Sequence, residues 1–350
     1  MLYRCTPDAW SHVGKPIRLL LGWLTVIGFT TSFLLVPLTC LVLPLVYLFV
    51  APPWAVAIIG SWLGTVLASF LFPQVEWPWA RKVGQLWYDL FDFHHNLTPE
   101  NREERIRLGR ENQYIIAMHP HGVIPLHAYL WAAYCDQYLS NAESGLYGFG
   151  AGADILEYLP VLRNIMGWLT AGSATYGVLK QGLLRGKSPP ANRVGRRPRN
   201  LFILPGGVAE IFTSAPGDHT IVFAQRRGLA RLSCETGAQL VPAYVFGATD
   251  FFGNALKSDS FLARLSRRLK AGIAIFWGLG GLPFVPFAPK VTLVIGDPIP
   301  VPEWEPADGC DTPPAEVVGR LHAEYLKAIV KLFDDYKAEA GYPDATLNVQ

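Results

Sequence analysis

The sequence predicts an α/β protein, with a mixed sheet flanked by helices, behind an N-terminal helical membrane hairpin. Three observations carry this prediction. The chain of 350 residues is 51% hydrophobic and has a mean hydropathy of +0.23, which is more apolar than an ordinary soluble domain. No charged residue occurs between Arg18 and Glu76. After this uncharged block, short apolar runs alternate with helical patterns, as they do in α/β domains.

The uncharged block is too long for a single membrane helix, which takes roughly 20 residues. It is long enough to cross twice, with an interruption at Pro52 and Pro53. Because basic residues flank both of its ends, the positive-inside rule places both ends in the cytosol. We therefore expect a tail and hairpin in residues 1–75 and one cytosolic domain in residues 76–350. A third crossing within residues 19–51 stays open, and it would put the domain in the lumen. The flanking basic residues are Lys15, Arg18, Arg81 and Lys82.

Five apolar runs predict buried strands, because each is short, is rich in β-branched or aromatic residues and ends at turn residues. Three helices have clear signals. Thr98 followed by Pro99 predicts a helix start, Gly237 predicts the end of a helix that follows Phe223, and residues 314–340 form a long amphipathic helix. The predicted strands are residues 114–118, 146–150, 200–205, 239–247 and 290–296.

Charge and cysteine usage exclude two broad classes. A formal net charge of +2, with dispersed basic residues, argues against nucleic acid as a partner. The five cysteines are far apart and show no CxxC spacing, so they indicate neither a disulfide framework nor a zinc knuckle.

The tetrapeptide His119-Pro120-His121-Gly122 is the first candidate site. It follows the strand predicted at residues 114–118, and ligands of α/β domains bind at the carboxyl ends of strands. Pro120 restrains the backbone and Gly122 frees it, so the two imidazoles are presented on a defined turn. A neutral imidazole can take a proton from a hydroxyl as that hydroxyl attacks an electrophile. We therefore predict a general base here.

Two other interpretations of the histidines stay open at this point. In one, both rings cap the next helix or belong to a buried hydrogen-bond network. In the other, His119, His121 and His127 hold a zinc ion, although no carboxylate with ligand spacing is near them. We expect no metal.

A second candidate site follows the strand predicted at residues 200–205. Gly206 and Gly207 free the backbone, and their amides can hold an oxyanion or a phosphate. Glu210 follows one turn later and can orient an imidazole. The alternative is that Gly206 and Gly207 form an ordinary turn with no functional role. Farther along the chain, Pro242 stands inside a predicted strand, which indicates a bulge or a sheet edge.

These motifs together resemble the type-2 diacylglycerol acyltransferases, a family that includes monoacylglycerol and wax-alcohol acyltransferases. The resemblance runs from about residue 75 to residue 340, with the blocks in the family's order. Two positions depart from the family pattern, since Leu229 stands where Phe is usual and Asp297 where Lys is usual. The matching blocks are HPHG at 119–122, YLPVLRNIMGWLTAGSAT at 158–175, GGVAE at 206–210, RRGLARLSCETGAQLVPAYVFG at 226–247 and GDPIPVP at 296–302.

The resemblance implies a glycerolipid-acyltransferase-like domain that uses acyl-CoA as a co-substrate and has no resident cofactor. It implies residence in the endoplasmic reticulum membrane and on lipid droplets, with the bilayer as a partner; homo-oligomerisation stays open. We expect acyl transfer to the free hydroxyl of diacylglycerol, with His121 as base, because it adjoins the flexible Gly122, and with His119 polarising or positioning. Glu210 or a backbone carbonyl would then fix the tautomer of the base.

Other residues are expected to bind substrate. The predicted binding residues are Pro120, Gly122, Arg163, Gly206, Gly207, Arg227 and Pro242. Arg226 and Arg231 are further candidates for the CoA phosphates, against the alternative of solvated surface arginines. The acceptor stays open among diacylglycerol, monoacylglycerol and a fatty alcohol. Outside enzymology, a lipid-binding or droplet-coating protein is the rival.

Residues 261–289 combine an amphipathic basic helix with a nearly uncharged stretch rich in Phe, Trp and Gly. This pattern indicates a helix in the membrane interface followed by a segment that dips into lipid. A plain amphipathic helix packed on the sheet is the equal alternative. Residues 185–200 are predicted to form a basic loop.

Overall fold

The computed structural model describes residues 1–104, 112–139, 148–186, 200–256, 259–269, 274–305 and 312–350. Within these residues an 8-stranded mixed sheet forms the centre of the molecule. Its order is β1 (Tyr3–Arg4), β2 (His94–His95), β11 (Thr292–Ile295), β8 (Gln239–Phe246), β3 (Tyr114–His119), β6 (Asn200–Ile203), β4 (Gly148–Gly152) and β5 (Ala171–Ser173). The strands from β8 to β5 run parallel, and β11 is antiparallel to β8.

The sheet is covered on both faces, and alternation along β3 shows how. Ile116 and Met118 belong to the hydrophobic core on one face, together with residues of α4 (Leu86–Leu90) and α6 (Leu126–Tyr134). Ile115 and Ala117 belong to the core on the other face, together with residues of α8 (Tyr176–Gly186), α10 (Gly228–Thr236) and α12 (Ala315–Ala340). Burial on both faces explains why the strands read as continuous apolar runs.

All five predicted strands are confirmed, with β4 described from Gly148 onward. The predicted helix signals are confirmed as well. Residues 99–104 are helical, and the hydroxyl of Thr98 accepts a hydrogen bond from the amide of Asn101 at 3.1 Å. Gly237 ends α10 with φ +74°. The basic loop predicted at 185–200 falls mostly on residues 187–199, outside the described residues.

One of the two histidines of β2 is buried. His95 is only 6% exposed, since it lies between β1 and β11 and its Nδ1 accepts a hydrogen bond from the amide of Leu97. No sequence pattern predicts β1, β2 or β5, which have only two or three residues each.

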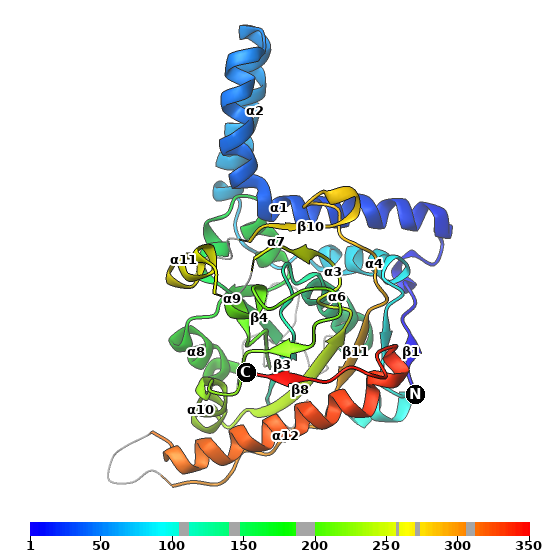
Figure 1. Ribbon diagram of the computed structural model, residues 1–350, viewed down its shortest axis with the longest axis vertical. Coiled ribbons are helices and arrows are strands. Elements are labelled where there is room, and N and C mark those ends of the chain that lie inside the picture. The colour runs from blue at the N-terminus through cyan, green and yellow to red at the C-terminus, as the bar shows by residue number, and fades with distance from the viewer. Residues whose placement is uncertain (105–111, 140–147, 187–199, 257–258, 270–273, 306–311) are drawn as a thin grey trace.

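The N-terminal apolar block folds into two helices, α1 (Lys15–Phe49) and α2 (Pro52–Leu71), with the predicted break before Pro52. Both are long and apolar enough to cross a membrane. Figure 1 shows that the first half of α1 lies across the α/β domain, whereas its second half and α2 project away side by side.

The first half of α1 contributes to the core of the domain through Val26 and Phe29. By length and composition, Lys15–Val36 and Pro52–Leu71 are the two segments that could each form a full crossing of roughly 20 residues, and part of the first is buried against the domain. The number of crossings and the domain boundary at residues 75 and 76 therefore stay predictions.

Candidate active site

The two candidate motifs meet at one edge of the sheet. His119 is the last residue of β3, and His121 lies in the loop that leads to α6. Gly206 and Gly207 begin α9 (Gly207–Ile211), the short helix after β6. Since β3 and β6 are parallel neighbours, their carboxyl ends lie side by side. This juxtaposition brings Glu210 to the histidines.

Glu210 connects both histidines to a third segment. Its Oε2 accepts a hydrogen bond from the main-chain amide of His121 at 2.6 Å, and its Oε1 accepts one from the amide of Val222 at 2.9 Å. Oε1 also lies 3.5 Å from Nδ1 of His119. Burial by itself would raise the pKa of this carboxyl, but the His119 ring and the two amides hold the pKa below its usual value. Glu210 is therefore a buried carboxylate that positions the turn between His119 and His121.

The ring of His121 is held in one tautomer. Its Nδ1 lies 2.9 Å from the carbonyl oxygen of Gly122. A carbonyl can only accept a hydrogen bond, so in the neutral ring the proton is on Nδ1 and the lone pair is on Nε2. Burial lowers the pKa of His121, although the Gly122 hydrogen bond and the charge of Glu210 act in the opposite direction. The ring is thus neutral at pH 7, with Nε2 as a free base.

His119 occupies a different environment from His121. It is fully buried, and its ring packs against Phe223 and Tyr325 at centroid distances of 5.2 and 6.2 Å. These two aromatic residues belong to the core under α12, on the face of the sheet opposite Ile116. His119 does not line the cavity beside His121. The peptide bond between His119 and Pro120 is cis.

Gly206 and Gly122 are required because other atoms lie where a Cβ would be. A Cβ on Gly206 would overlap the carboxyl group of Glu210, which folds back over the start of α9. Gly122 has φ +71°, and a Cβ there would lie 2.7 Å from the carbonyl oxygen of Ala248. Gly207 has φ +51° and lines the cavity, and its amide already donates to Leu204 O at 3.2 Å. Its predicted role in holding an oxyanion stays a prediction.

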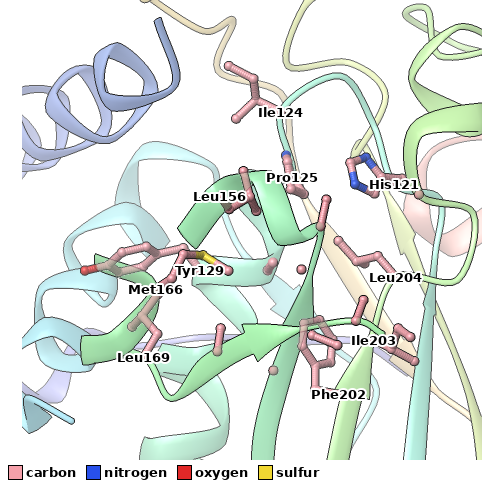
Figure 2. A pocket seen from close by; sticks show the side chains of 18 of the residues that line it. His121, Ile124, Pro125, Tyr129, Leu156, Met166, Leu169, Phe202, Ile203 and Leu204 are labelled. Atoms are coloured by element: carbon pink, nitrogen blue, oxygen red, sulfur yellow. The ribbon is translucent and has the colours of Figure 1, made fainter. Parts of the chain in front are cut away.

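A cavity of about 830 Å³ opens beside His121. Figure 2 shows the imidazole on one side of this cavity, with Tyr129, Met166 and Leu169 on the other side and Phe202 below. The wall is mostly apolar, and the volume of the cavity is within the range of small-molecule sites. The first half of α1 forms part of the wall through Phe29, Phe33, Leu34 and Val36.

One charged residue of the wall was not expected from the sequence as a site residue. Arg81, predicted only as a charge flanking the membrane block, is 3% exposed and lines the cavity. Its guanidinium donates to the carbonyl of Leu169 and the hydroxyl of Thr170, and it lies 3.7 Å from Glu76. Its position on α3 (Pro78–Gly84), directly after the apolar block, was the available signal.

Arg163, predicted to bind substrate, contacts the apolar helix α2. It donates to the carbonyls of Ser69 and Glu157, and its guanidinium stacks over the ring of Phe70 at 4.9 Å. A cation at a helix C-terminus is favourable, because the last carbonyls of a helix have no intrahelical partner. Arg163 therefore anchors the end of α2, and its contribution to CoA binding stays a prediction.

The other predicted arginines lie on and just before α10. Arg226 donates to the carbonyls of Pro205 and Gly206, both at 2.9 Å, and so supports the turn before α9. Arg227 is exposed, and Arg231 pairs with Glu235 at 2.7 Å. A role of Arg226, Arg227 and Arg231 in binding the CoA phosphates stays a prediction.

Pro242 lies inside the sheet rather than at an edge, so the edge alternative was wrong. The pairing of β8 with β11 stops at Ala243, and the chain pairs again only at Leu240, opposite Ile299. Pro242 occupies this interruption, which explains how a strand interior accepts a residue without an amide hydrogen. The side chain of Pro242 does not line the cavity.

A metal site has no support among the described residues, where no group of three His, Cys, Asp or Glu side chains can hold an ion. His127, the third histidine of the zinc alternative, is buried in α6. Burial lowers the pKa of His127 to about 3, so this ring is neutral.

Comparison with known proteins decides the family. Residues 46–350 match the sequence model of the family described as diacylglycerol acyltransferase. This chain belongs to that family. It is 26% identical to diacylglycerol O-acyltransferase 2 of Mus musculus, over 95% of this chain and 82% of the relative. It is 30% identical to 2-acylglycerol O-acyltransferase 3 of Homo sapiens, over 77% of this chain and 76% of the relative.

Acyl-CoA wax alcohol acyltransferase 2 of Mus musculus is a further relative, at 26% identity over 67% of this chain and 68% of the relative. Among solved structures, the 1-acyl-sn-glycerophosphate acyltransferase PlsC from Thermotoga maritima is similar over 91% of this chain and 98% of its own, with 14% identity and a TM-score of 0.41. The match to the family model confirms the predicted family, and the protein is an acyltransferase.

Proposed function

We propose that this enzyme transfers a fatty acyl group from acyl-CoA to the free hydroxyl of diacylglycerol, with His121 as the general base. The observation that carries the proposal is an imidazole in the wall of an apolar cavity, with Nδ1 held by the Gly122 carbonyl and with no hydrogen bond to Nε2 from the residues that the structure describes. Such a ring can accept a proton at one defined atom.

In the proposed reaction, Nε2 of His121 takes the proton of the acceptor hydroxyl while its oxygen bonds to the thioester carbonyl carbon. The carbon–sulfur bond then breaks, and the proton on Nε2 passes to the leaving thiolate of CoA. The Gly122 carbonyl and the Glu210 carboxylate stabilise the transient imidazolium, one by a hydrogen bond and the other by its charge.

His119 is a positioning residue in this proposal, because it is buried behind β3 and does not line the cavity. It contacts Glu210, which in turn holds the main-chain amide of His121. Pro120 and Gly122 shape the same turn. In this proposal His119, Pro120 and Gly122 therefore serve to hold His121 in place.

Diacylglycerol is favoured as the acceptor by the apolar wall of the cavity and by the relatives that carry this name. Monoacylglycerol and fatty alcohols are the alternative acceptors, since relatives with those names are equally similar. We further propose that the two apolar helices hold the enzyme in the endoplasmic reticulum membrane, with the catalytic domain in the cytosol, and that it also resides on lipid droplets.

The test is acyl transfer by membranes that contain the enzyme, with radiolabelled acyl-CoA and each of the three acceptors in turn. Triacylglycerol as the main labelled product supports the proposal. Diacylglycerol as the main product would instead identify monoacylglycerol as the acceptor, and wax ester would identify a fatty alcohol. The His121→Ala variant is the matched control for background activity. Turnover of all acceptors by this variant at the wild-type rate would remove His121 from the mechanism.

A further inference from the structure

One apolar segment of the domain has no role in the proposed chemistry. Residues 275–285, here called the apolar loop, include β10 (Phe276–Trp277), which pairs with β9 (Gly253–Asn254). Main-chain hydrogen bonds from Gly278 to Leu282 O and from Leu279 to Val285 O keep the loop compact. It nevertheless exposes four large apolar side chains, which are Ile275, Trp277, Leu279 and Leu282, at 55%, 40%, 42% and 44%.

The apolar loop is attached to the membrane helix α1. The hydroxyl of Thr30, a buried residue of α1, donates to the carbonyl of Phe284 at 2.5 Å. In Figure 1, β10 lies beside the first half of α1, on the side of the domain from which α2 projects. The exposed side chains are thus continuous with the two apolar helices rather than scattered singly over the surface.

The apolar loop and α1 also meet at the cavity. Phe276 of the loop lines the cavity, as do Phe33 and Val36 of α1. Among the large apolar side chains of the wall, the exposed ones are Val36 and Ile155, at 38% and 39%. Where the wall reaches the surface it is therefore apolar, which is unfavourable against water and favourable against lipid.

Aromatic and basic residues surround this region. Trp77 and Trp79, which are 46% and 52% exposed, follow the end of α2. On α11 (Phe261–Leu269), Arg264 and Arg268 are exposed, and so is Phe261. Tryptophan and arginine at the edge of an apolar surface are typical of proteins seated at the headgroup level of a bilayer.

We propose that the apolar loop is a further membrane-contacting element, and that it and α1 hold the mouth of the cavity against the bilayer, so that long-chain lipids enter sideways from the membrane. The identity of the lipids rests on the proposed function, whereas the position of the loop does not. The equal alternative from the sequence, a helix packed on the sheet followed by core, does not account for the exposure of the four side chains.

A fluorescence experiment tests the position of the loop without turnover. The full-length enzyme, with Cys40 and Cys310 replaced by Ser, carries an environment-sensitive dye at Leu279→Cys. The matched control carries it at Glu324→Cys, an exposed position on α12, on the opposite side of the domain (Figure 1). In phosphatidylcholine vesicles with nitroxide-labelled acyl chains, we expect quenching at position 279 and none at 324. Equal quenching of the dye at both positions, or quenching at neither, would overturn the proposal.

An activity experiment tests the consequence. The Leu279→Ser/Leu282→Ser variant removes two exposed apolar side chains that do not line the cavity. We expect acylation of a bilayer-supplied acceptor to fall about tenfold, because less apolar area enters the lipid, with no change for the acceptor in detergent micelles. Val330→Ser, at an exposed apolar residue of α12, is the control and should leave both rates unchanged. Undiminished acylation from the bilayer would contradict the proposed entry route.

The two experiments separate this inference from the proposed function. If the enzyme fails to acylate diacylglycerol but the dye at position 279 is quenched, the proposed acceptor is wrong and the proposed membrane contact of the apolar loop is supported. If diacylglycerol is acylated but the dye is not quenched, the proposed membrane contact of the loop is wrong and the proposed function is supported.

Discussion

The close approach of Gly206 to Glu210 leads to a specific prediction about catalysis. In Gly206→Ala the new Cβ would overlap the carboxyl group of Glu210. A carboxyl group at the end of a flexible side chain can rotate away, so the variant should still fold. Once it rotates, it no longer accepts the hydrogen bonds from His121 N and Val222 N at 2.6 and 2.9 Å.

The expected loss follows from these two hydrogen bonds. A hydrogen bond to a charged group contributes about 1.5–3 kcal/mol, so the loss of both gives about 3–6 kcal/mol. Because each 1.36 kcal/mol is a factor of ten in rate, we expect kcat/KM to fall by roughly 10²- to 10⁴-fold if the turn depends on both bonds. The assay is acyl transfer from radiolabelled acyl-CoA, at equal amounts of membrane-bound enzyme.

Alanine variants of two other glycines, Gly207 and Gly177, serve as controls. Gly207→Ala meets no atom within 4 Å but has φ +51°, so it should cost only about 1–2 kcal/mol of backbone strain. Gly177→Ala on α8 meets no atom within 4 Å and should be neutral or slightly stabilising. A Gly206→Ala enzyme as active as Gly177→Ala would refute the role of Glu210 in positioning His121.

Five further outcomes are expected. His121→Ala and His119→Ala should both abolish transfer without loss of protein from the membrane; product formation at the wild-type rate by either variant would show that its ring is dispensable. Because the pKa of His121 is lowered from 6.5, the neutral base persists below that pH and the acid limb of kcat/KM should lie below pH 6.5. Glu210→Gln removes a charge that raises this pKa, so the acid limb should move to still lower pH, and a shift upward would contradict the assignment. Ala132→Phe narrows the cavity and should favour shorter acyl chains in a competition between acyl-CoA lengths, whereas an unchanged preference would place the chain elsewhere. Arg163→Ala should lower the melting temperature more than it raises the KM for acyl-CoA, and the opposite result would favour a phosphate-binding role.

Much of the fold could be predicted because the main signals are local. A strand buried on both faces reads as an apolar run, and the five longest such runs all became strands. The start at Thr98 and the stop at Gly237 depend on side-chain capping and on a positive φ, both of which are properties of a few adjacent residues. By contrast, β1 and β2 have two residues each and exist only because the sheet offers them an edge.

Part of the site could also be predicted. The order of HPHG and GGVAE identified His119, His121 and Glu210, since both motifs follow strands. The sequence could not show which of the two histidines faces the cavity, because only Pro120 separates them. Strand alternation decides it: His119 points to the face covered by α12, and the loop after β3 places His121 beside the cavity.

The sequence by itself determined the apolar N-terminal block, the alternating strands and helices, and the motifs that identify the family, because periodicity, charge and turn chemistry are encoded within a few residues of each other. Only the tertiary structure decided that the first half of α1 covers the cavity, that Arg81 enters its wall and that Arg163 holds the end of α2. These contacts join residues far apart in the chain, and their geometry depends on how complete helices pack on the finished sheet.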